Sequence, residues 1–273
     1  MIYLNGKFMP IHEAFVPVLD RGFIFGDGVY EVIPAYSRKL FRLNEHLNRL
    51  QHSLDGIRLK NPHSNEEWRH LLEQVIDCND SDDQYIYLHI TRGVAKRDHA
   101  FPVNVTPTVF IMSNPLLPPP ATLLGSGVSA ITAIDNRWIR CDVKAISLLP
   151  NVLLRQLAID DGFLTEGAAS NIFVVKNNVL LAPPKSNLML PGITYDVILE
   201  LAATHQIPHE VRQISETETR NADEVLLTSS TKEILPITTL DGKLVGNGKP
   251  GATFSRLYAL YQNFKNTRMR SSS

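Results

Sequence analysis

A proline-rich segment near the middle of the chain constrains the fold more than any other sequence feature. The segment Asn114-Pro115-Leu116-Leu117-Pro118-Pro119-Pro120 contains four prolines. Proline has a fixed φ and no backbone N–H donor, so this segment cannot continue a helix or a central strand. We therefore predict an interdomain linker at residues 114–121, between a small N-terminal domain (residues 1–113) and a larger C-terminal domain (residues 122–273).

Patterns on both sides of this linker predict a mixture of helices and strands. Gln84–Thr91 alternates apolar and polar residues, which is typical of a strand. Ser64 and Glu67 form a capping-box pattern ahead of an amphipathic helix. Asn171–Lys176 and Val179–Ala182 predict a hairpin in the second half. Because strands and helices mix in both halves, an α+β fold is favoured over a doubly wound sheet.

Two further helices are predicted with specific starting residues. Asn44 is expected to cap a helix that carries His46 and His52, both on its solvent-facing surface. Thr194 is expected to cap a second helix over Gly192–His205.

Composition and charge exclude several classes of partner. The chain has 273 residues, a formal net charge of −1 and a pI of about 6.8, so no long-range field favours nucleic acid or an anionic membrane. No stretch is long and apolar enough to span a bilayer, and Met1–Pro10 lacks the features of a signal peptide. Cys78 and Cys141 form no paired motif, so a reduced, cytoplasmic setting is expected. The nine histidines have no convincing ligand spacing, so no metal site is predicted.

Lys144 is the first candidate for chemistry, in a strand-like run with Arg137 and Arg140 before it. A lysine among apolar neighbours is costly unless it is paired, exposed or covalently used. One interpretation is a solvated lysine on an edge strand. The other is an amine whose pKa is lowered by burial and nearby positive charge, so that it can bond to a carbonyl carbon.

Two segments are suited to binding a phosphate group. Gly192-Ile193-Thr194 opens a helix, where free amides and the helix dipole favour an anion. Thr228-Ser229-Ser230-Thr231 places hydroxyl groups directly after a buried strand. Each pattern is also common as a simple cap or turn.

Three other segments place polar groups where a ligand could meet them. Gly26-Asp27-Gly28-Val29-Tyr30-Glu31 is either a tight turn or a turn whose glycines let another group approach closely. Glu166 precedes an apolar strand and faces either water or a cation, such as a protonated ring nitrogen. The loop after Thr91 carries Arg97 and His99, which form either a solvated basic loop or a carboxylate-binding site.

Taken together and in this order, these segments resemble the fold-type IV family of pyridoxal-phosphate (PLP) enzymes. The resemblance rests on Phe25–Glu31, Asn44–Leu50, Lys144, Thr165–Gly167, Ser170–Phe173, Pro191–Thr194 and Thr228–Glu233. The family contains D-amino-acid aminotransferases, branched-chain aminotransferases and 4-amino-4-deoxychorismate lyases. It implies a two-domain α+β fold, with a small α/β N-terminal domain and a larger β-rich C-terminal domain that anchors PLP.

The resemblance also implies roles for individual residues. Lys144 would hold PLP covalently and move the proton between the amino-acid α-carbon and the cofactor. Glu166 would pair with the protonated pyridine nitrogen, and Tyr30 would lie near the reacting atoms. The cofactor phosphate would be held by Arg49, Ile193, Thr194, Ser230 and Thr231.

Arg97 and His99 resemble the carboxylate trap of D-amino-acid aminotransferases, and Arg137 matches a position near the substrate in that group. There the loop reaches the active site of the neighbouring subunit, so a homodimer with active sites at its interface is implied. The expected reaction moves the amino group of a D-amino acid, such as D-alanine, to a 2-oxo acid, such as 2-oxoglutarate. The alternative is a 4-amino-4-deoxychorismate lyase, which releases pyruvate and 4-aminobenzoate.

The chain departs from the family pattern in two places. Family members usually have further residues between the helix that ends at Gly162 and the Thr165-Glu166-Gly167 motif, and these form a strand. Here that strand is expected to be shortened, lost or replaced by unwound helix. Ala168-Ala169 stand where relatives often have serines. A third hypothesis, a weakly active cofactor-binding or scaffold protein damaged by the shortening, is disfavoured by the presence of Lys144, Glu166, Tyr30 and Arg49.

Overall fold

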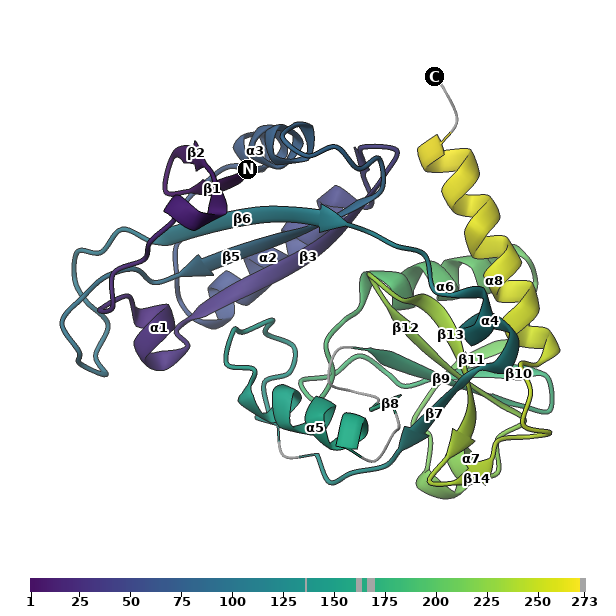
Figure 1. Cartoon of the computed structure of the whole chain (residues 1–273). Helices are drawn as coiled ribbons and strands as arrows, with labels where there is room; N and C mark the ends of the chain where they lie inside the picture. Colours follow the sequence, from purple (N-terminus) through teal and green to yellow (C-terminus); the bar gives the residue numbers. More distant parts are fainter. Residues whose placement is uncertain (136, 161–163, 166–169, 271–273) are drawn as a thin grey trace. The chain divides into compact units, whose positions relative to one another are not determined.

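The computed structural model describes residues 1–135, 137–160, 164–165 and 170–270 (Figure 1). The chain divides into two compact units. The N-terminal unit comprises Met1–Leu117 and Asp142–Leu148, and the C-terminal unit comprises Pro118–Cys141 and Leu149–Ser273. The chain thus passes between units inside the proline-rich segment, whereas Asp142–Leu148 packs with the N-terminal unit despite its place in the sequence. The domain bounds 1–113 and 122–273, with a linker at residues 114–121, stay a prediction.

The N-terminal unit is built on an antiparallel sheet with the strand order β2-β1-β6-β5-β3-β4. Its strands are β1 (Ile2–Leu4), β2 (Lys7–Met9), β3 (Gly28–Tyr36), β4 (Lys39–Leu40), β5 (Gln84–Thr91) and β6 (Thr108–Pro115). The predicted bounds of β5 are confirmed. Its apolar residues Ile86, Leu88 and Ile90 are fully buried, because alternate side chains of a strand point to one face.

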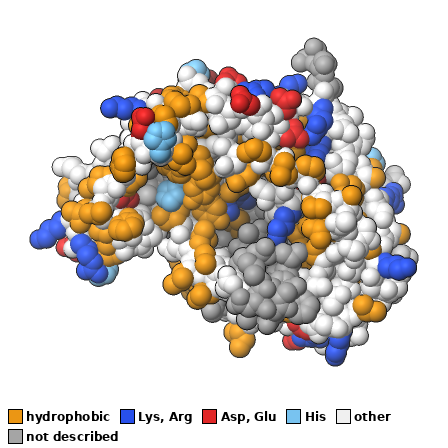
Figure 2. Space-filling view, viewed as in Figure 1, with side chains coloured by type: hydrophobic (Ala, Val, Ile, Leu, Met, Phe, Trp, Pro, Cys, Tyr) orange, Lys and Arg blue, Asp and Glu red, His pale blue; other side chains and the backbone are white. Residues whose placement is uncertain are grey.

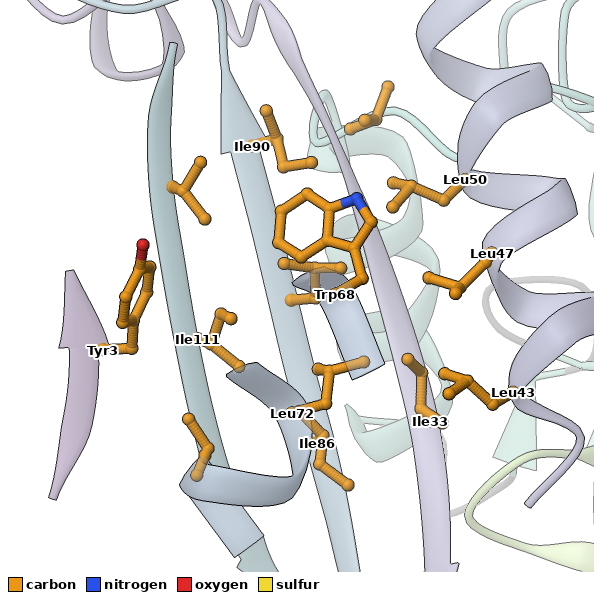
Figure 3. Packing of buried hydrophobic residues seen from close by; sticks show 14 of the residues in the cluster. Tyr3, Ile33, Leu43, Leu47, Leu50, Trp68, Leu72, Ile86, Ile90 and Ile111 are labelled. Atoms are coloured by element: carbon orange, nitrogen blue, oxygen red, sulfur yellow. The ribbon is translucent and has the colours of Figure 1, made fainter. Parts of the chain in front are cut away.

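Two helices cover that face of the sheet, α2 (Leu43–Gly56) and α3 (Asn65–Asp77). Figure 3 shows Trp68 of α3 at the centre of the resulting core, between Leu50 of α2 and Ile90 of the sheet. All three side chains are fully buried, and such burial stabilises the fold by roughly 1.5–3 kcal/mol per large apolar side chain. The short helices η1 (Ile11–Glu13) and α1 (Arg21–Phe25) lie before β3.

The starts of two helices test the predicted caps. Ser64 accepts a hydrogen bond from the Glu67 amide, and Glu67 bonds back to the Ser64 amide, so the predicted capping box is confirmed. The predicted cap at Asn44 is wrong, because the cap of α2 is Arg42 in a left-handed conformation. Leu43, which is buried, already belongs to the helix, so core packing sets the start ahead of the side chain suited to capping.

The C-terminal unit forms, among its described residues, a mixed sheet with the order β11-β10-β9-β12-β13-β7-β8, and β14 pairs with β13. The strands are β7 (Val128–Ile131), β8 (Leu164–Thr165), β9 (Asn171–Lys176), β10 (Val179–Ala182), β11 (His209–Val211), β12 (Glu224–Ser229), β13 (Glu233–Leu240) and β14 (Lys243–Leu244). The helices are α4 (Ala121–Ser126), α5 (Leu149–Asp160), α6 (Ile193–Thr204), α7 (Glu216–Arg220) and α8 (Ala252–Lys265), which continues into η2 (Asn266–Arg270). Both units combine helices with a sheet, antiparallel in the N-terminal unit and mixed in the C-terminal unit, so this is an α+β fold.

The shortened segment retains a strand. Helix α5 continues to Asp160, and the described residues of β8 are Leu164 and Thr165. These two residues pair in parallel with Ala130 and Ile131 of β7. A strand is therefore present here and is not lost, while its shortening stays a prediction because residues 161–163 and 166–169, with Glu166 and Ala168-Ala169 among them, lie outside the described residues. Across the part of the chain that the structure describes, no helix has the length and apolar character needed to cross a membrane.

Candidate active site

The segment that carries Lys144 is attached to the edge of β3. The Tyr30 amide donates to the Lys144 carbonyl oxygen at 3.0 Å, and the Ile146 amide donates to the Gly28 carbonyl oxygen at 3.1 Å. Between them, Val29 and Ala145 form an isolated antiparallel bridge. The predicted strand around Lys144 is therefore limited to this bridge, because only the first residues of β3 have a free edge to offer.

The glycines before β3 make this attachment possible. A side chain at Gly28 would overlap the Ile90 carbonyl oxygen and lie 2.9 Å from Ile146 Cδ1. Gly26 has a φ of 65°, and its carbonyl oxygen accepts a hydrogen bond from Ser147 at 3.0 Å. The interpretation that these glycines let another group approach closely is confirmed: Gly26 is approached by Ser147, and Gly28 by Ile146 and by the carbonyl oxygen of Ile90.

A fully buried carboxylate organises the other side of β3. Arg49 donates to both oxygens of Glu31 at 2.7 Å, and Nδ1 of His46 lies 2.9 Å from the same carboxylate. His46 and Arg49 are three residues apart on α2 and so lie on one helix face. Burial alone would raise the pKa of Glu31, but Arg49 and His46 outweigh it and lower the pKa to about 2. Glu31 is thus held as an anion.

This cluster corrects one prediction about histidines. His46 is fully buried rather than on the surface, because it fills the space between α2 and Glu31. Burial lowers the pKa of its ring against the opposing effect of Glu31. His52 does lie at the surface, as predicted, with Nε2 3.1 Å from Asp142 Oδ2. The partner of His46 is Glu31 in β3, and helix periodicity in the sequence could not show a contact between these two elements.

The amine of Lys144 lies 4.0 Å from the centre of the Tyr30 ring. Burial, followed by the positive charge of Arg49, lowers the pKa of Lys144 to about 7, with Glu31 acting in the opposite direction. Burial and the Glu31 charge raise the pKa of Tyr30 to about 12. The structure thus brings together three residues predicted from the sequence: Tyr30, Arg49 and Lys144. Near neutral pH a substantial share of the amine is uncharged and able to act as a nucleophile or base, while Tyr30 keeps its proton.

Arg97 and His99 lie in the loop between β5 and β6, and both are exposed. They flank one ring: the Arg97 guanidinium carbon is 5.4 Å from the centre of Phe25, and the His99 ring centre is 5.2 Å from it. The structure therefore places both side chains against Phe25, as a pair of polar groups that face solvent.

In the C-terminal unit, the start of α6 lies beside the end of β12. Gly192 caps α6 without a side-chain bond, and a side chain there would overlap Asn171. Asn171 pairs with Thr228 in the sheet, and Ser230 and Thr231 follow β12. The aromatic rings of Tyr195 and Phe173 stack at 4.9 Å, which holds α6 over β9. The predicted cap at Thr194 is wrong, because the helix already begins at the buried residue Ile193.

Two further predicted site residues are Arg137 and Glu166. Arg137 donates to Asp135 from Nε at 2.9 Å and from Nη2 at 2.7 Å. Glu166 lies outside the described residues. Sequence reasoning, for its part, missed Glu31 and His46. An acidic residue that follows Tyr30 in an otherwise apolar strand is the signal that could have pointed to a buried ion pair.

The lowered pKa of Lys144 predicts how stability depends on pH in the cofactor-free protein. Below the folded-state pKa of about 7 the folded protein bears the cost of a partly buried charge, and above the ordinary value of 10.5 neither state is charged. Lys144→Met is therefore expected to raise the melting temperature more at about pH 6 than at about pH 9. The exposed Lys60→Met is the control. A Lys144→Met effect that is equal at both values, or larger at the higher one, would contradict the lowered pKa.

Comparison with known proteins identifies the family. A model of the class IV aminotransferases matches residues 28–240. The D-alanine aminotransferase of Bacillus licheniformis is 39% identical over 272 residues, which cover 96% of each chain. That of Staphylococcus aureus strain MSSA476 is 36% identical over 273 residues, covering 96% of this chain and 97% of the relative.

Solved structures agree with this family. The Escherichia coli branched-chain amino acid aminotransferase superimposes with a TM-score of 0.88 at 28% identity, over 100% of this chain and 95% of the other. A branched-chain amino acid aminotransferase from a second organism, T.th., solved with pyridoxamine 5'-phosphate, has a TM-score of 0.91 at 25% identity, over 98% and 94% of the two chains. With a matching family model and relatives above 30% identity along nearly its whole length, this chain belongs to the class IV aminotransferases, the fold-type IV family, and is a PLP-dependent enzyme.

Proposed function

We propose that this chain transfers the amino group of a D-amino acid, such as D-alanine, to a 2-oxo acid, such as 2-oxoglutarate. The observation that carries the proposal is that the N-terminal unit contains both kinds of group that this reaction needs. Lys144 has a pKa lowered to about 7, and Arg97 and His99 form an exposed pair at Phe25. The lysine amine can act as the base that transamination requires, and the arginine–histidine pair can bind a substrate carboxylate. The relatives named D-alanine aminotransferases support this substrate class over the lyase alternative.

The residues present fit PLP. Its aldehyde requires an uncharged amine, and Lys144 has a pKa lowered to about 7. Its phosphate requires amides and hydroxyl groups, and the start of α6 supplies amides with no side-chain cap beside the hydroxyl-bearing end of β12. When bound, PLP supplies an electron-withdrawing ring that accepts the electron pair left by the departing α-proton. We assign phosphate binding to Arg49, Ile193, Thr194, Ser230 and Thr231.

Lys144 has two roles in this proposal. It would hold the cofactor covalently until the amino group of the substrate displaces it, and the freed amine would then take the α-proton of the amino acid and return a proton at C4′ of the cofactor. A base with a pKa of about 7 is well matched to this exchange at neutral pH, since both of its protonation states are populated. Tyr30, which keeps its proton and lies against the amine, orients the reacting groups.

The remaining site residues are assigned by their position in the sequence. Glu166 follows β8 directly, and we propose that its carboxylate pairs with the protonated pyridine nitrogen. Arg137 is proposed to lie near the substrate and to be oriented by its two hydrogen bonds to Asp135. Arg97 and His99 bind the substrate carboxylate, for which a planar guanidinium and a ring N–H are suitable donors.

We further propose that the enzyme is a homodimer. The N-terminal unit exposes many large apolar side chains, and Figure 2 shows hydrophobic surface gathered on it. This apolar surface comprises Ile11, Phe15, Val16, Val18, Leu19, Phe23, Val94, Phe101 and Val103. Exposed apolar side chains favour burial against another protein. Val94, Phe101 and Val103 belong to the loop that carries Arg97 and His99, so we propose that a second copy of the chain packs against this loop. Neither Cys78 nor Cys141 forms a disulfide among the described residues, which supports a cytoplasmic setting.

The first test is a visible absorption spectrum of the purified protein before and after addition of D-alanine, and separately of L-alanine. The yellow band of the lysine-bound cofactor is expected to shift with the D-isomer only, and to be missing from Lys144→Ala. Response to both isomers would contradict D-specificity. A band that responds to neither isomer, with turnover of 4-amino-4-deoxychorismate, would establish the lyase instead.

The carboxylate-binding role is tested by steady-state kinetics of Arg97→Ala. Loss of a charge-assisted hydrogen bond worth about 1.5–3 kcal/mol is expected to raise KM for D-alanine by about tenfold or more. Arg97→Lys keeps the charge but not the planar fork and should fall in between. Loss of PLP occupancy without a change in KM would contradict the assignment.

The homodimer is tested by light scattering during size-exclusion chromatography. The wild type is expected to be a dimer, and Phe15→Asp, at a side chain that is 81% exposed, is expected to produce monomers with reduced activity. Leu244→Asp, an exposed apolar position of the C-terminal unit, is the matched control and should remain dimeric. A wild type that is monomeric and fully active would refute the proposal.

A further inference from the structure

The loop of Arg97 and His99, residues 93–107 between β5 and β6, is closed at its base. Gly93 has a φ of 97°, and a side chain there would overlap the carbonyl oxygen of Thr106 at the other end of the loop. Asp20, which caps α1, accepts a hydrogen bond from Thr108 at 2.6 Å, and its backbone bridges to Val94. The segment around α1 thus holds both ends of the loop.

The tip of the loop is held by a buried arginine. Arg21 is 4% exposed, and its Nη1 donates to the carbonyl oxygens of Asp98 at 2.6 Å and Ala100 at 3.4 Å. These two carbonyl groups belong to the residues on either side of His99. One guanidinium therefore fixes the backbone from which His99 projects and which directly follows Arg97.

The guanidinium of Arg21 is itself fixed by Asp27. Asp27 Oδ2 accepts from Nε of Arg21 at 2.8 Å and from Nε of Arg92 at 2.8 Å, and Oδ1 accepts from Nη2 of Arg92 at 3.0 Å. Burial raises the pKa of Asp27, but its bonds to Arg92 and Arg21 outweigh this and lower it. The guanidinium carbon of Arg92 also lies 3.9 Å from the centre of the Phe101 ring. The same cluster therefore contacts the loop at Phe101, after His99.

Phe25 completes the arrangement from within α1. Its ring centre is 4.8 Å from the guanidinium carbon of Arg21, which faces the loop backbone. The same ring is contacted by both Arg97 and His99. Because these two exposed side chains contact the same aromatic ring, their separation is limited before any ligand arrives, which lowers the entropy cost of binding.

We propose that Arg21, Asp27 and Phe25 are positioning residues that hold Arg97 and His99 at the separation needed to bind one carboxylate group, and so set the affinity for amino and 2-oxo acids without touching them. This inference rests on the proposed function of Arg97 and His99. None of the three residues bonds substrate in this scheme. Their effect comes from order in the loop that is established before the substrate binds.

The test compares Arg21→Met and Phe25→Leu with the wild-type holoenzyme. KM for D-alanine and for 2-oxoglutarate is expected to rise by about tenfold or more while kcat changes much less, since misplacement of binding groups by about 1 Å can cost up to about 100-fold. The second readout is limited trypsin digestion, because Lys96 and Arg97 are exposed cleavage sites within the loop. Both variants are expected to be cut there faster than the wild type.

Arg38→Met is the matched control. Arg38 also donates to two backbone carbonyl oxygens, those of Ile76 at 3.0 Å and Ser81 at 3.4 Å, but away from the loop. It should leave KM and cleavage at Lys96 and Arg97 unchanged. Asp27→Asn is avoided because it leaves two buried arginines without their anion. If Arg21→Met does not fold, Phe25→Leu decides, since it leaves the ion cluster intact.

The outcomes separate this inference from the function on which it rests. A raised KM with faster cleavage in the loop supports it. Unchanged KM and unchanged cleavage in both variants overturns it, even where Arg97→Ala raises KM. If the wild type does not act on D-alanine, the proposed function fails, and faster cleavage in the variants still establishes that these residues hold the loop.

Discussion

The attachment of Asp142–Leu148 to the edge of β3 is the contact on which the rest of the site depends. Two backbone hydrogen bonds and one bridge place Lys144 beside Tyr30, and glycines at 26 and 28 leave room for them. A side chain at Gly28 would clash with the carbonyl oxygen of Ile90 in β5 and with Ile146 in the lysine-bearing segment. The reactive amine is thus positioned by main-chain contacts, which vary less than side-chain rotamers.

The charge of that amine is set by a balance around Glu31. Arg49 lowers the pKa of Lys144, whereas Glu31 raises it and at the same time holds Arg49 in place. A buried carboxylate with two cationic or hydrogen-bonding partners is costly to desolvate, and it adds little to stability compared with an apolar core. Its value lies in positioning Arg49, whose charge lowers the pKa of Lys144 and which, in our proposal, binds the cofactor phosphate.

The N-terminal unit contains two polar clusters, one around Glu31 and one around Asp27, and they have different roles. The cluster of Glu31 is buried between β3 and α2, and its charges act on the amine of Lys144. The cluster of Asp27 sits at the base of the loop, where Arg21 and Arg92 reach backbone carbonyl groups and aromatic rings rather than other acids. Both follow from one short stretch, Asp27 to Glu31, so the start of β3 links the lysine, the arginine of α2 and the carboxylate-binding loop.

Local patterns in the sequence determined the elements whose signal is carried by a few adjacent residues: the strand Gln84–Thr91, the capping box of Ser64, and the glycines that let another backbone approach. The family followed from the order of short motifs along the chain. The helix starts at Leu43 and Ile193, the burial of His46 and the return of Asp142–Leu148 to the N-terminal unit were decided only by tertiary structure. The physical reason is the same in each case: burial against residues distant in sequence outweighs local propensities, which are worth less than about 1 kcal/mol per residue.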